Sequence, residues 1–275
     1  MTVSEILHSL EQQLRPVSAD YAMVEAEVVL EHLLNCSRSQ LYLIGADEVS
    51  AETCAAVHRI AARRLRREPL PYILGSAFFY TREFTVTADV LIPRPDTEAL
   101  VEAVLAAEDT APRRVIDVGT GSGVLAAILQ EQRPAWRIVA TDISRPALRI
   151  ARENCARSIA LVYGDMLSFI KKRPVFNALI SNPPYVSRDE FAHLEPDVTD
   201  YEPRVALDGG PDGLRFYRIL ASQAGARLAP GGRIYCEIGF SQKESACEIF
   251  AHHGWRDIRI ALDNAGRPRV LRAHT

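Results

Sequence analysis

The feature of this 275-residue sequence that most limits its fold is an alternation of strand-like and helix-like segments from residue 113 onward. Short apolar runs bounded by turn residues are typical of buried strands, and apolar residues three or four apart are typical of helices. We predict strands at 115–118, 137–141, 160–163, 175–181, 233–238, 258–262 and 269–272, and helices at 122–132, 145–156, 214–228 and 242–252. This pattern predicts an α/β fold with a mostly parallel, helix-covered sheet of seven strands whose last pair forms an antiparallel edge.

The residues before this region predict a small helical domain and a linker. Apolar residues at helical spacing predict helices at 3–15 and 19–34, and Ser50 is a suitable N-cap for a third helix that reaches about residue 67. Pro69 and Pro71 would end that helix. Aromatic and β-branched residues then alternate with turn residues, which predicts a hairpin. We therefore expect a helical domain at 1–72, a β-hairpin linker at 73–92 and a larger domain at 93–275.

One dense basic run, Arg63-Arg64-Leu65-Arg66-Arg67, lies at the end of the third predicted helix. Positive charge suits the C-terminal end of a helix dipole, so a solvated helix end is the interpretation that we favour. The alternative is a contact with an acidic or RNA-containing partner.

The overall charge and the cysteines exclude several classes of protein. The net charge is −3, from 32 Lys and Arg against 35 Asp and Glu, so we expect no stable nucleic-acid partner. The five cysteines form no C-x-x-C pair and the histidines no H-E-x-x-H motif, which predicts reduced thiols and no metal site. The sequence has neither a secretory signal pattern at its start nor an apolar run of membrane-spanning length, so we expect a cytoplasmic protein without a membrane contact.

A glycine-rich turn, Asp117-Val118-Gly119-Thr120-Gly121-Ser122-Gly123, joins the first predicted strand to its helix. Glycines there let the backbone approach a ligand. The next two strands end at Asp142, which can accept hydrogen bonds from ribose hydroxyls, and at Asp165, which can accept one from the adenine amine while Met166 packs on the ring. Either acid alone could be a helix cap. Together, the three strand ends predict a site for an adenosine-containing cofactor.

The spacing of the glycines separates two such cofactors. A dinucleotide site has the pattern G-x-G-x-x-G, whereas this turn has G-x-G-x-G and is preceded by Asp117. An acid at that position suits the ammonium group of S-adenosylmethionine, which is the cofactor that we predict.

The fourth predicted strand of this domain ends in Ser181-Asn182-Pro183-Pro184-Tyr185. The prolines stiffen the loop and remove two backbone donors, leaving the Asn182 side-chain oxygen and the Pro183 carbonyl as acceptors. Planar nitrogens are poor nucleophiles because their lone pair is delocalised. Two fixed acceptors for the N–H bonds would localise that lone pair and aim it at a methyl donor, while the Tyr185 ring would form a wall of the site. An ordinary proline turn is the alternative.

A second proline-rich segment, Ile92-Pro93-Arg94-Pro95-Asp96-Thr97-Glu98, predicts an extended entry to a helix that ends near residue 107. Asp96 or Thr97 can cap that helix. The segment could also bring Arg94 and Thr97 to the edge of a pocket.

These motifs together resemble the HemK/PrmC family, the protein-glutamine N5-methyltransferases of peptide chain release factors. The resemblance covers nearly the whole chain. It is carried by residues 117–123, 182–185 and 92–98, by Glu68-Pro69-Leu70-Pro71-Tyr72-Ile73-Leu74-Gly75, by Tyr201-Glu202-Pro203-Arg204 and by Ala265-Gly266-Arg267-Pro268-Arg269. The motif Asn-Pro-Pro-Tyr alone is shared with adenine and guanine amino-methyltransferases, whereas the segment at 92–98 is more restrictive.

The resemblance implies a Rossmann-like class I methyltransferase domain and a helical domain that docks the release factor. We expect the protein to be a monomer. The substrate would be the glutamine of the Gly-Gly-Gln motif, contacted by Arg94, Asn182, Pro183, Pro184 and Tyr185. The donor would contact Asp117, Gly119, Thr120, Gly121, Ser122, Gly123, Asp142, Asp165, Met166 and Asn182. Met166 stands where relatives often have an aromatic residue, and Thr81 where they often have glycine.

Three other functions fit the same motifs. Asn-Pro-Pro-Tyr and the arginine run would suit an amino-methyltransferase acting on adenine N6 or guanine N2 of nucleic acid. A glutamine of a ribosomal protein could be the substrate instead. A nucleoside-binding module without turnover is the non-enzymatic alternative.

Overall fold

The computed structural model describes residues 1–275 and divides the chain into two compact units. The helical unit comprises Met1–Gly75 and Glu195–Tyr201, and the sheet unit comprises Ser76–Leu194 and Glu202–Thr275. The segment at 195–201 thus belongs to the helical unit although its neighbours on both sides belong to the other. No helix is both long and apolar enough to span a membrane.

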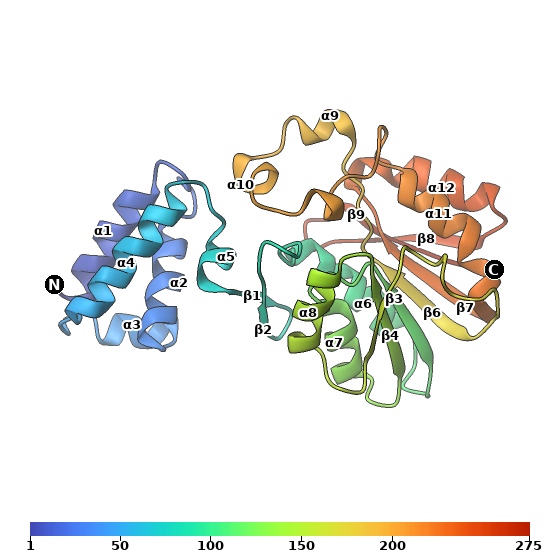
Figure 1. Ribbon diagram of the computed structural model, residues 1–275, viewed down its shortest axis with the longest axis horizontal. Helices are drawn as coiled ribbons and strands as arrows, with labels where there is room; N and C mark the ends of the chain where they lie inside the picture. The colour runs from blue at the N-terminus through green and yellow to red at the C-terminus, as the bar shows by residue number, and fades with distance from the viewer. The chain divides into compact units, whose positions relative to one another are not determined.

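The helical unit contains α1 (Val3–Leu14), α2 (Ala22–Leu34), α3 (Arg38–Leu43), α4 (Ala51–Arg64) and α5 (Leu70–Leu74), together with α10 (Pro196–Thr199) (Figure 1). Its core is formed by aliphatic side chains of the longer helices, among them Leu10, Leu14, Val29 and Leu30. Ser50 caps α4 by accepting a hydrogen bond from Thr53 N, as predicted. A short helix, α5, follows Pro69 where the sequence predicted only a stop.

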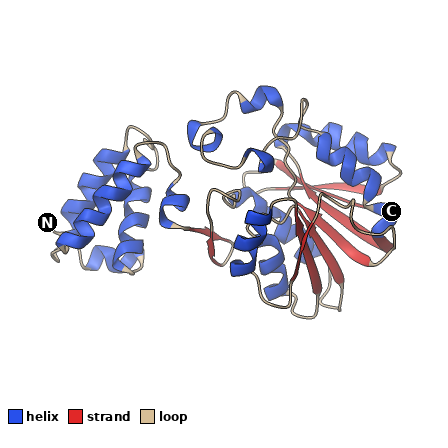
Figure 2. Cartoon of the chain, viewed as in Figure 1, coloured by secondary structure: helices blue, strands red, loops and turns tan.

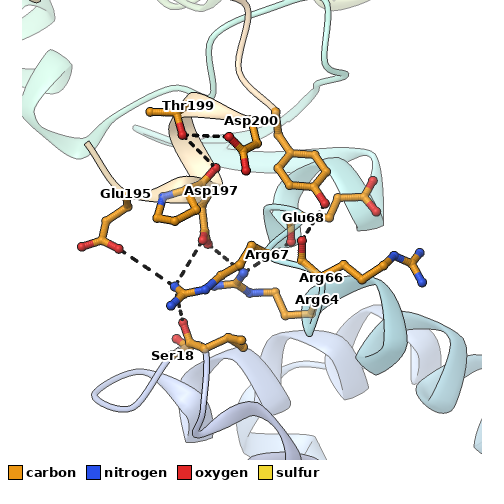
Figure 3. Close-up of polar contacts among 12 residues, drawn as sticks. Ser18, Arg64, Arg66, Arg67, Glu68, Glu195, Asp197, Thr199 and Asp200 are labelled. Atoms are coloured by element: carbon orange, nitrogen blue, oxygen red, sulfur yellow. Dashed lines mark hydrogen bonds and ion pairs between the residues drawn. The ribbon is translucent and has the colours of Figure 1, made fainter. Parts of the chain in front are cut away.

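The arginine run at the end of α4 is paired within the helical unit (Figure 3). Arg64 is 5% exposed and forms ion pairs with Glu25 (2.8 Å) and Asp197 (2.7 Å). Arg67 contacts Asp197 at 3.4 Å, and the Tyr201 hydroxyl donates to the Arg66 carbonyl at 2.6 Å. The interpretation of this run as a solvated helix end is therefore wrong for Arg64, because the acidic partners come from the same chain.

The sheet unit begins with a hairpin of β1 (Ser76–Phe79) and β2 (Arg82–Thr85) and then a 3-10 turn, η1 (Pro95–Thr97), that leads into α6 (Glu98–Ala107). Its main sheet, whose strands are red in Figure 2, has the order β5-β4-β3-β6-β7-β9-β8. The strands are β3 (Arg114–Val118), β4 (Arg137–Asp142), β5 (Ala160–Tyr163), β6 (Phe176–Ser181), β7 (Leu228–Glu237), β8 (Arg256–Leu262) and β9 (Pro268–His274). Strands β3 to β7 run parallel, and β9 is antiparallel to both of its neighbours, which confirms the predicted fold class.

Alternate residues of the central strands face two different cores, as the twofold period of a strand requires. Val115 and Ile180 belong to the core beneath α6 and α7 (Val124–Gln132), whereas Ile116 and Leu179 belong to the core beneath α11 (Arg215–Gln223) and α12 (Lys243–His252). Helix α8 (Arg145–Asn154) packs on β4 and β5. Two short elements, α9 (Arg188–Phe191) and η2 (Arg204–Ala206), precede and follow α10 in the sequence. The remaining 3-10 turns are η3 (Gly225–Arg227) and η4 (Phe240–Gln242).

The strand order places a topological switch beside β3. The chain runs from β3 outward through β4 to β5 and then returns to β6 on the other side of β3. In such sheets, ligands bind outside the carboxyl ends of the strands at the switch point. The glycine-rich turn after β3 and the loop that starts at Asn182 after β6 both lie there.

Candidate active site

A cavity of about 230 Å³ opens at the carboxyl ends of β3, β4, β5 and β6, entirely within the sheet unit. Of the predicted site residues, it is lined by Arg94, Gly119, Thr120, Gly121, Ser122, Asp142, Asp165, Met166, Asn182 and Pro184. Asp117, Gly123, Pro183 and Tyr185 do not line it. The structure therefore brings most of the predicted residues together around one space.

The glycine-rich turn is held on β4 by two backbone hydrogen bonds, from Gly119 N and Thr120 N to the Thr141 carbonyl, each 2.9 Å long. Gly119 and Gly121 have positive φ angles of 75° and 55°, which favour glycine, and a Cβ atom at either would meet no atom within 4 Å. Gly123 has a different role, because a Cβ there would lie 2.7 Å from Cys155 Sγ. The first two glycines thus leave open backbone beside the cavity, and the third allows α7 and α8 to pack closely.

Two acids lie near the turn, of which Asp117 is buried and Asp142 is half-buried. Asp142 accepts hydrogen bonds from Gly121 N (2.9 Å) and Ser144 N (2.8 Å), and burial raises its pKa. Asp117 is fully buried and accepts a hydrogen bond from the Thr120 hydroxyl through Oδ2 (2.6 Å), whereas its Oδ1 has no partner. Burial raises the pKa of Asp117 to about 7. An unpartnered buried carboxyl oxygen behind a cavity-lining threonine is a feature that a bound cation could satisfy.

The loop after β6 presents Asn182 to the cavity. Its Nδ2 donates to the Thr97 hydroxyl at 3.1 Å, and its Oδ1 receives no hydrogen bond from the protein. Ser181 donates to the Val118 carbonyl at 2.7 Å, which joins the ends of β6 and β3. The Thr97 side chain does not cap α6 as predicted: the backbone at Thr97 is already helical, whereas a capping residue is usually extended.

The Tyr185 ring packs against the core beneath α11 and α12, and its hydroxyl donates to Glu237 Oε1 at 3.2 Å. Burial is the main reason that the pKa of Tyr185 is raised above its ordinary value of 10. Tyr185 is thus placed behind the loop, whereas the sequence predicted a wall of the site.

Arg94 lines the cavity and forms an ion pair with the buried Glu202, which also accepts a hydrogen bond from Ile92 N at 3.4 Å. Glu202 and Glu237 were not among the predicted site residues. The signal for Glu202 was present in the motif Tyr201-Glu202-Pro203-Arg204, and that for Glu237 was a lone acid at the end of an apolar strand.

Comparison with known proteins gives matches to two domain families and to individual full-length relatives. The model of the PrmC N-terminal domain matches residues 5–75, and that of the methyltransferase small domain matches residues 95–195. A release factor glutamine methyltransferase from Koribacter versatilis (strain Ellin345) is 39% identical over 98% of both chains. One from Geobacter sulfurreducens is 37% identical over 98% of this chain and 95% of that protein. This chain belongs to the release factor glutamine methyltransferase family.

The family membership confirms the resemblance that the motifs indicated. A bifunctional methyltransferase from Rickettsia typhi is also 31% identical over 98% of this chain, which corresponds to 57% of that longer protein. Among solved structures, the hMettl16 catalytic domain in complex with an RNA hairpin shares the fold at a TM-score of 0.55 and 15% identity, over 82% of both chains. A methyltransferase from Pyrococcus furiosus shares it at a TM-score of 0.50 and 15% identity, covering 82% of this chain and 98% of that one. These two likenesses concern the fold alone.

Proposed function

We propose that this methyltransferase transfers a methyl group from S-adenosylmethionine to the side-chain amide nitrogen (N5) of the glutamine in the Gly-Gly-Gln motif of release factors. The observation that carries the proposal is the Asn182 side chain, whose Oδ1 is free of protein donors at the cavity while its Nδ2 is held by Thr97. Relatives that match nearly the full length of the chain are release factor glutamine methyltransferases, which supports the substrate class.

The proposed donor site consists of residues from three strand ends. Open backbone at Gly119 and Gly121 gives room for the ligand, and the oxygens of Asp142 can accept hydrogen bonds from ribose hydroxyls. The unpartnered Asp117 Oδ1 could balance the charge of the donor's ammonium group through the Thr120 end of the cavity. When bound, S-adenosylmethionine supplies a methyl group activated by a sulfonium. We assign Thr120, Ser122, Asp165 and Met166, which line the cavity, to the same site, whereas Gly123 allows α7 and α8 to pack closely behind it.

The loop at 182–185 would prepare the glutamine amide for reaction. The amide nitrogen is a poor nucleophile because its lone pair is delocalised into the carbonyl group. Asn182 Oδ1 and the Pro183 carbonyl, neither of which receives a hydrogen bond from the protein, would accept the two amide N–H bonds. Such acceptors fix the nitrogen and favour the charge distribution of the transition state. Pro184 and Arg94 line the cavity beside Asn182 and would contact the substrate, and Tyr185 would support the loop.

The helical unit would contribute to docking of the release factor, with the enzyme acting as a monomer. Three apolar side chains at helical spacing are exposed on or just before α2: Tyr21 (68%), Val24 (50%) and Val28 (39%). Exposed apolar stripes of this kind are typical of protein contacts. Replacing Val24 and Val28 by Glu should raise KM for a release factor without lowering kcat, and a KM equal to that of the unaltered enzyme would contradict this docking surface.

The direct test uses purified enzyme, methyl-labelled S-adenosylmethionine and a release factor. Label should appear on the Gly-Gly-Gln glutamine, as mapped by mass spectrometry, and a factor with that glutamine replaced by alanine should remain unlabelled. Label found only in DNA, in RNA or in a ribosomal protein would refute the assigned substrate. Donor binding without transfer to any protein would indicate a binding module.

A further inference from the structure

An asparagine side chain can lie in either of two orientations that differ by a 180° rotation of its amide group. One orientation presents Oδ1, an acceptor, to the cavity, and the other presents Nδ2, a donor. Only the first can receive an N–H bond from a substrate amide. A methyltransferase that uses Asn182 as proposed above therefore needs a device that excludes the second orientation.

Thr97 supplies the first part of this device. Its Oγ1 accepts a hydrogen bond from Asn182 Nδ2 at 3.1 Å, and Thr97 is only 3% exposed. A hydroxyl has a single proton, so if Thr97 donates that proton elsewhere it can meet Asn182 only as an acceptor. The orientation of Asn182 thus depends on where the Thr97 proton points.

Glu237, at the end of β7, carries the carboxyl group with which the Thr97 hydroxyl interacts. Its carboxyl group is fully buried, its Oε1 accepts from the Tyr185 hydroxyl at 3.2 Å, and its Oε2 has no hydrogen-bond partner, so it is open to a further donor. The ionised carboxylate has no proton to donate, so a hydroxyl that bonds to it must act as the donor.

Gln242, in η4, holds the loop at 182–185 at a second point. Gln242 Nε2 donates to the Tyr185 carbonyl at 2.8 Å, and Gln242 Oε1 accepts from the Tyr217 hydroxyl at 2.8 Å. Gly239 N in turn donates to that hydroxyl at 3.1 Å. Residues 237–242 therefore hold Tyr185 at its hydroxyl and at its carbonyl, which leaves the loop little freedom to move.

We propose that Glu237 is a positioning residue for methyl transfer: acting through the Thr97 hydroxyl, it fixes the Asn182 amide with Oδ1 toward the substrate. This inference rests on the proposed role of Asn182. Glu237 itself does not line the cavity and contacts neither reactant. When Glu237 is protonated, it can donate a hydrogen bond to Thr97, and the Thr97 proton is then free to turn toward Asn182 and allow the other orientation.

The charged and titratable groups that face Glu237 come from four elements. Tyr185 lies in the loop after β6, Asp96 precedes α6, Arg269 belongs to β9, and Cys236 precedes Glu237 in β7. The Arg269 guanidinium pairs with Asp96 (2.7 Å) and Asp263 (3.1 Å), and no cation lies within ion-pair distance of Glu237. Burial outweighs the attraction of Arg269 and raises the pKa of Glu237 to about 7.

The test compares Thr97→Val, Thr97→Ser and Glu237→Gln with the unaltered enzyme in methylation of a release factor. Transfer by the unaltered enzyme establishes the proposed function separately. We expect Thr97→Val to lower kcat by about 10- to 100-fold, the range expected for misplacing a reacting group, with donor affinity unchanged. Thr97→Ser keeps the hydroxyl and should restore most of kcat. A Thr97→Val enzyme that binds donor and retains full kcat would overturn the proposal.

The pH profile provides a readout that a merely structural role would not move. At saturating donor, whose ammonium group would keep Asp117 ionised, the kcat of the unaltered enzyme should rise with pH through an apparent pKa of about 7, and the Glu237→Gln and Thr97→Val profiles should lack that step. Tyr235→Phe is a matched control, because it removes a buried tyrosine hydroxyl that donates to another buried glutamate, Glu108, at 2.7 Å. It should keep the step. A step that persists in Glu237→Gln would overturn the proposal even if that variant were less stable.

NMR of the ¹⁵N-labelled enzyme tests the orientation without turnover. The Asn182 side-chain amide, assigned with Asn182→Asp, should lose its hydrogen-bonded proton signal in Thr97→Val and keep it in Thr97→Ser. An Asn182 signal that is the same in all three proteins would contradict control by Thr97.

Discussion

Two buried polar clusters, one in each unit, differ in how their charges are compensated. In the helical unit, the Arg64 guanidinium has two carboxylate partners, and although burial opposes its charge, hydrogen bonds to Glu25 and Asp197 raise its pKa. In the sheet unit, Glu237 has no ion-pair partner and accepts a hydrogen bond from the Tyr185 hydroxyl, and burial raises its pKa to about 7. The first cluster is held in one charge state, and the second can change its charge near neutral pH. That difference separates a structural network from one suited to a reaction.

The largest effect is expected from Asn182→Ala, which removes the acceptor that the Glu237 cluster holds in place. Turnover should fall by about 10²- to 10³-fold, as for loss of one preorganised transition-state contact. Donor affinity, measured by calorimetry, should change little because the glycine-rich turn and Asp142 remain. Turnover near that of the unaltered enzyme would remove the basis for both the proposed function and the further inference.

Arg64→Met tests the other cluster. Removing the guanidinium leaves Glu25 and Asp197 without their buried cation, and breaking a buried pair costs about 3 kcal/mol or more. The free energy of unfolding of the helical unit, measured by urea denaturation, should decrease accordingly. A variant as stable as the unaltered protein would show that the arginine cluster does not stabilise the unit.

The pH dependence of stability should distinguish Glu237 from its glutamine variant. Because the pKa of Glu237 rises from its ordinary 4.5 to about 7 in the folded protein, the folded state binds more protons than the unfolded state between these values. Stability from this group is therefore present below about pH 4.5 and is lost as the pH rises to about 7. As the pH rises through that window, the free energy of unfolding of Glu237→Gln should increase relative to that of the unaltered protein, by up to about 1.4 kcal/mol per pH unit. A constant difference would contradict the raised pKa.

The smallest effect is expected from Arg15→Ala, which serves as the exposed counterpart of Arg64. Arg15 forms an ion pair with Glu11 one turn earlier on α1, and its side chain is 66% exposed. Such pairs contribute only about 0.3–0.5 kcal/mol. A loss of stability as large as that of Arg64→Met would show that burial is not what separates the clusters.

The sequence predicted those parts of the fold that depend on local pattern. The seven strands and the position of Asn182 at the end of β6 were predicted from apolar runs and turn residues. The role of Gly119 and Gly121 was predicted because a turn that a ligand approaches needs backbone without side chains. Thr97 was predicted as a helix cap, because its local setting is that of one, or as a residue at the edge of a pocket, and it does line the cavity. Its partner, Asn182, lies 85 residues away in the chain, and no local pattern reports such a contact.

The partners of the buried acids and arginines were also beyond local prediction. Glu237 contacts Tyr185 across 52 residues, and the buried guanidinium of Arg64 pairs with Asp197, far away in the chain. In each case the residue type signals only that a charge must be compensated if it is buried. Which residue compensates it is decided by the packing of the whole unit.

The place of Glu195–Tyr201 in the helical unit makes that unit discontinuous along the sequence. Cutting the protein after residue 75 would not yield two self-sufficient halves, because the N-terminal piece would keep Arg64 without Asp197 and the other piece would carry Asp197 without Arg64. Exchanging the first 75 residues between relatives would have the same defect unless the matching seven-residue segment were exchanged with them. The helical unit can therefore be transplanted or engineered only as a pair of segments.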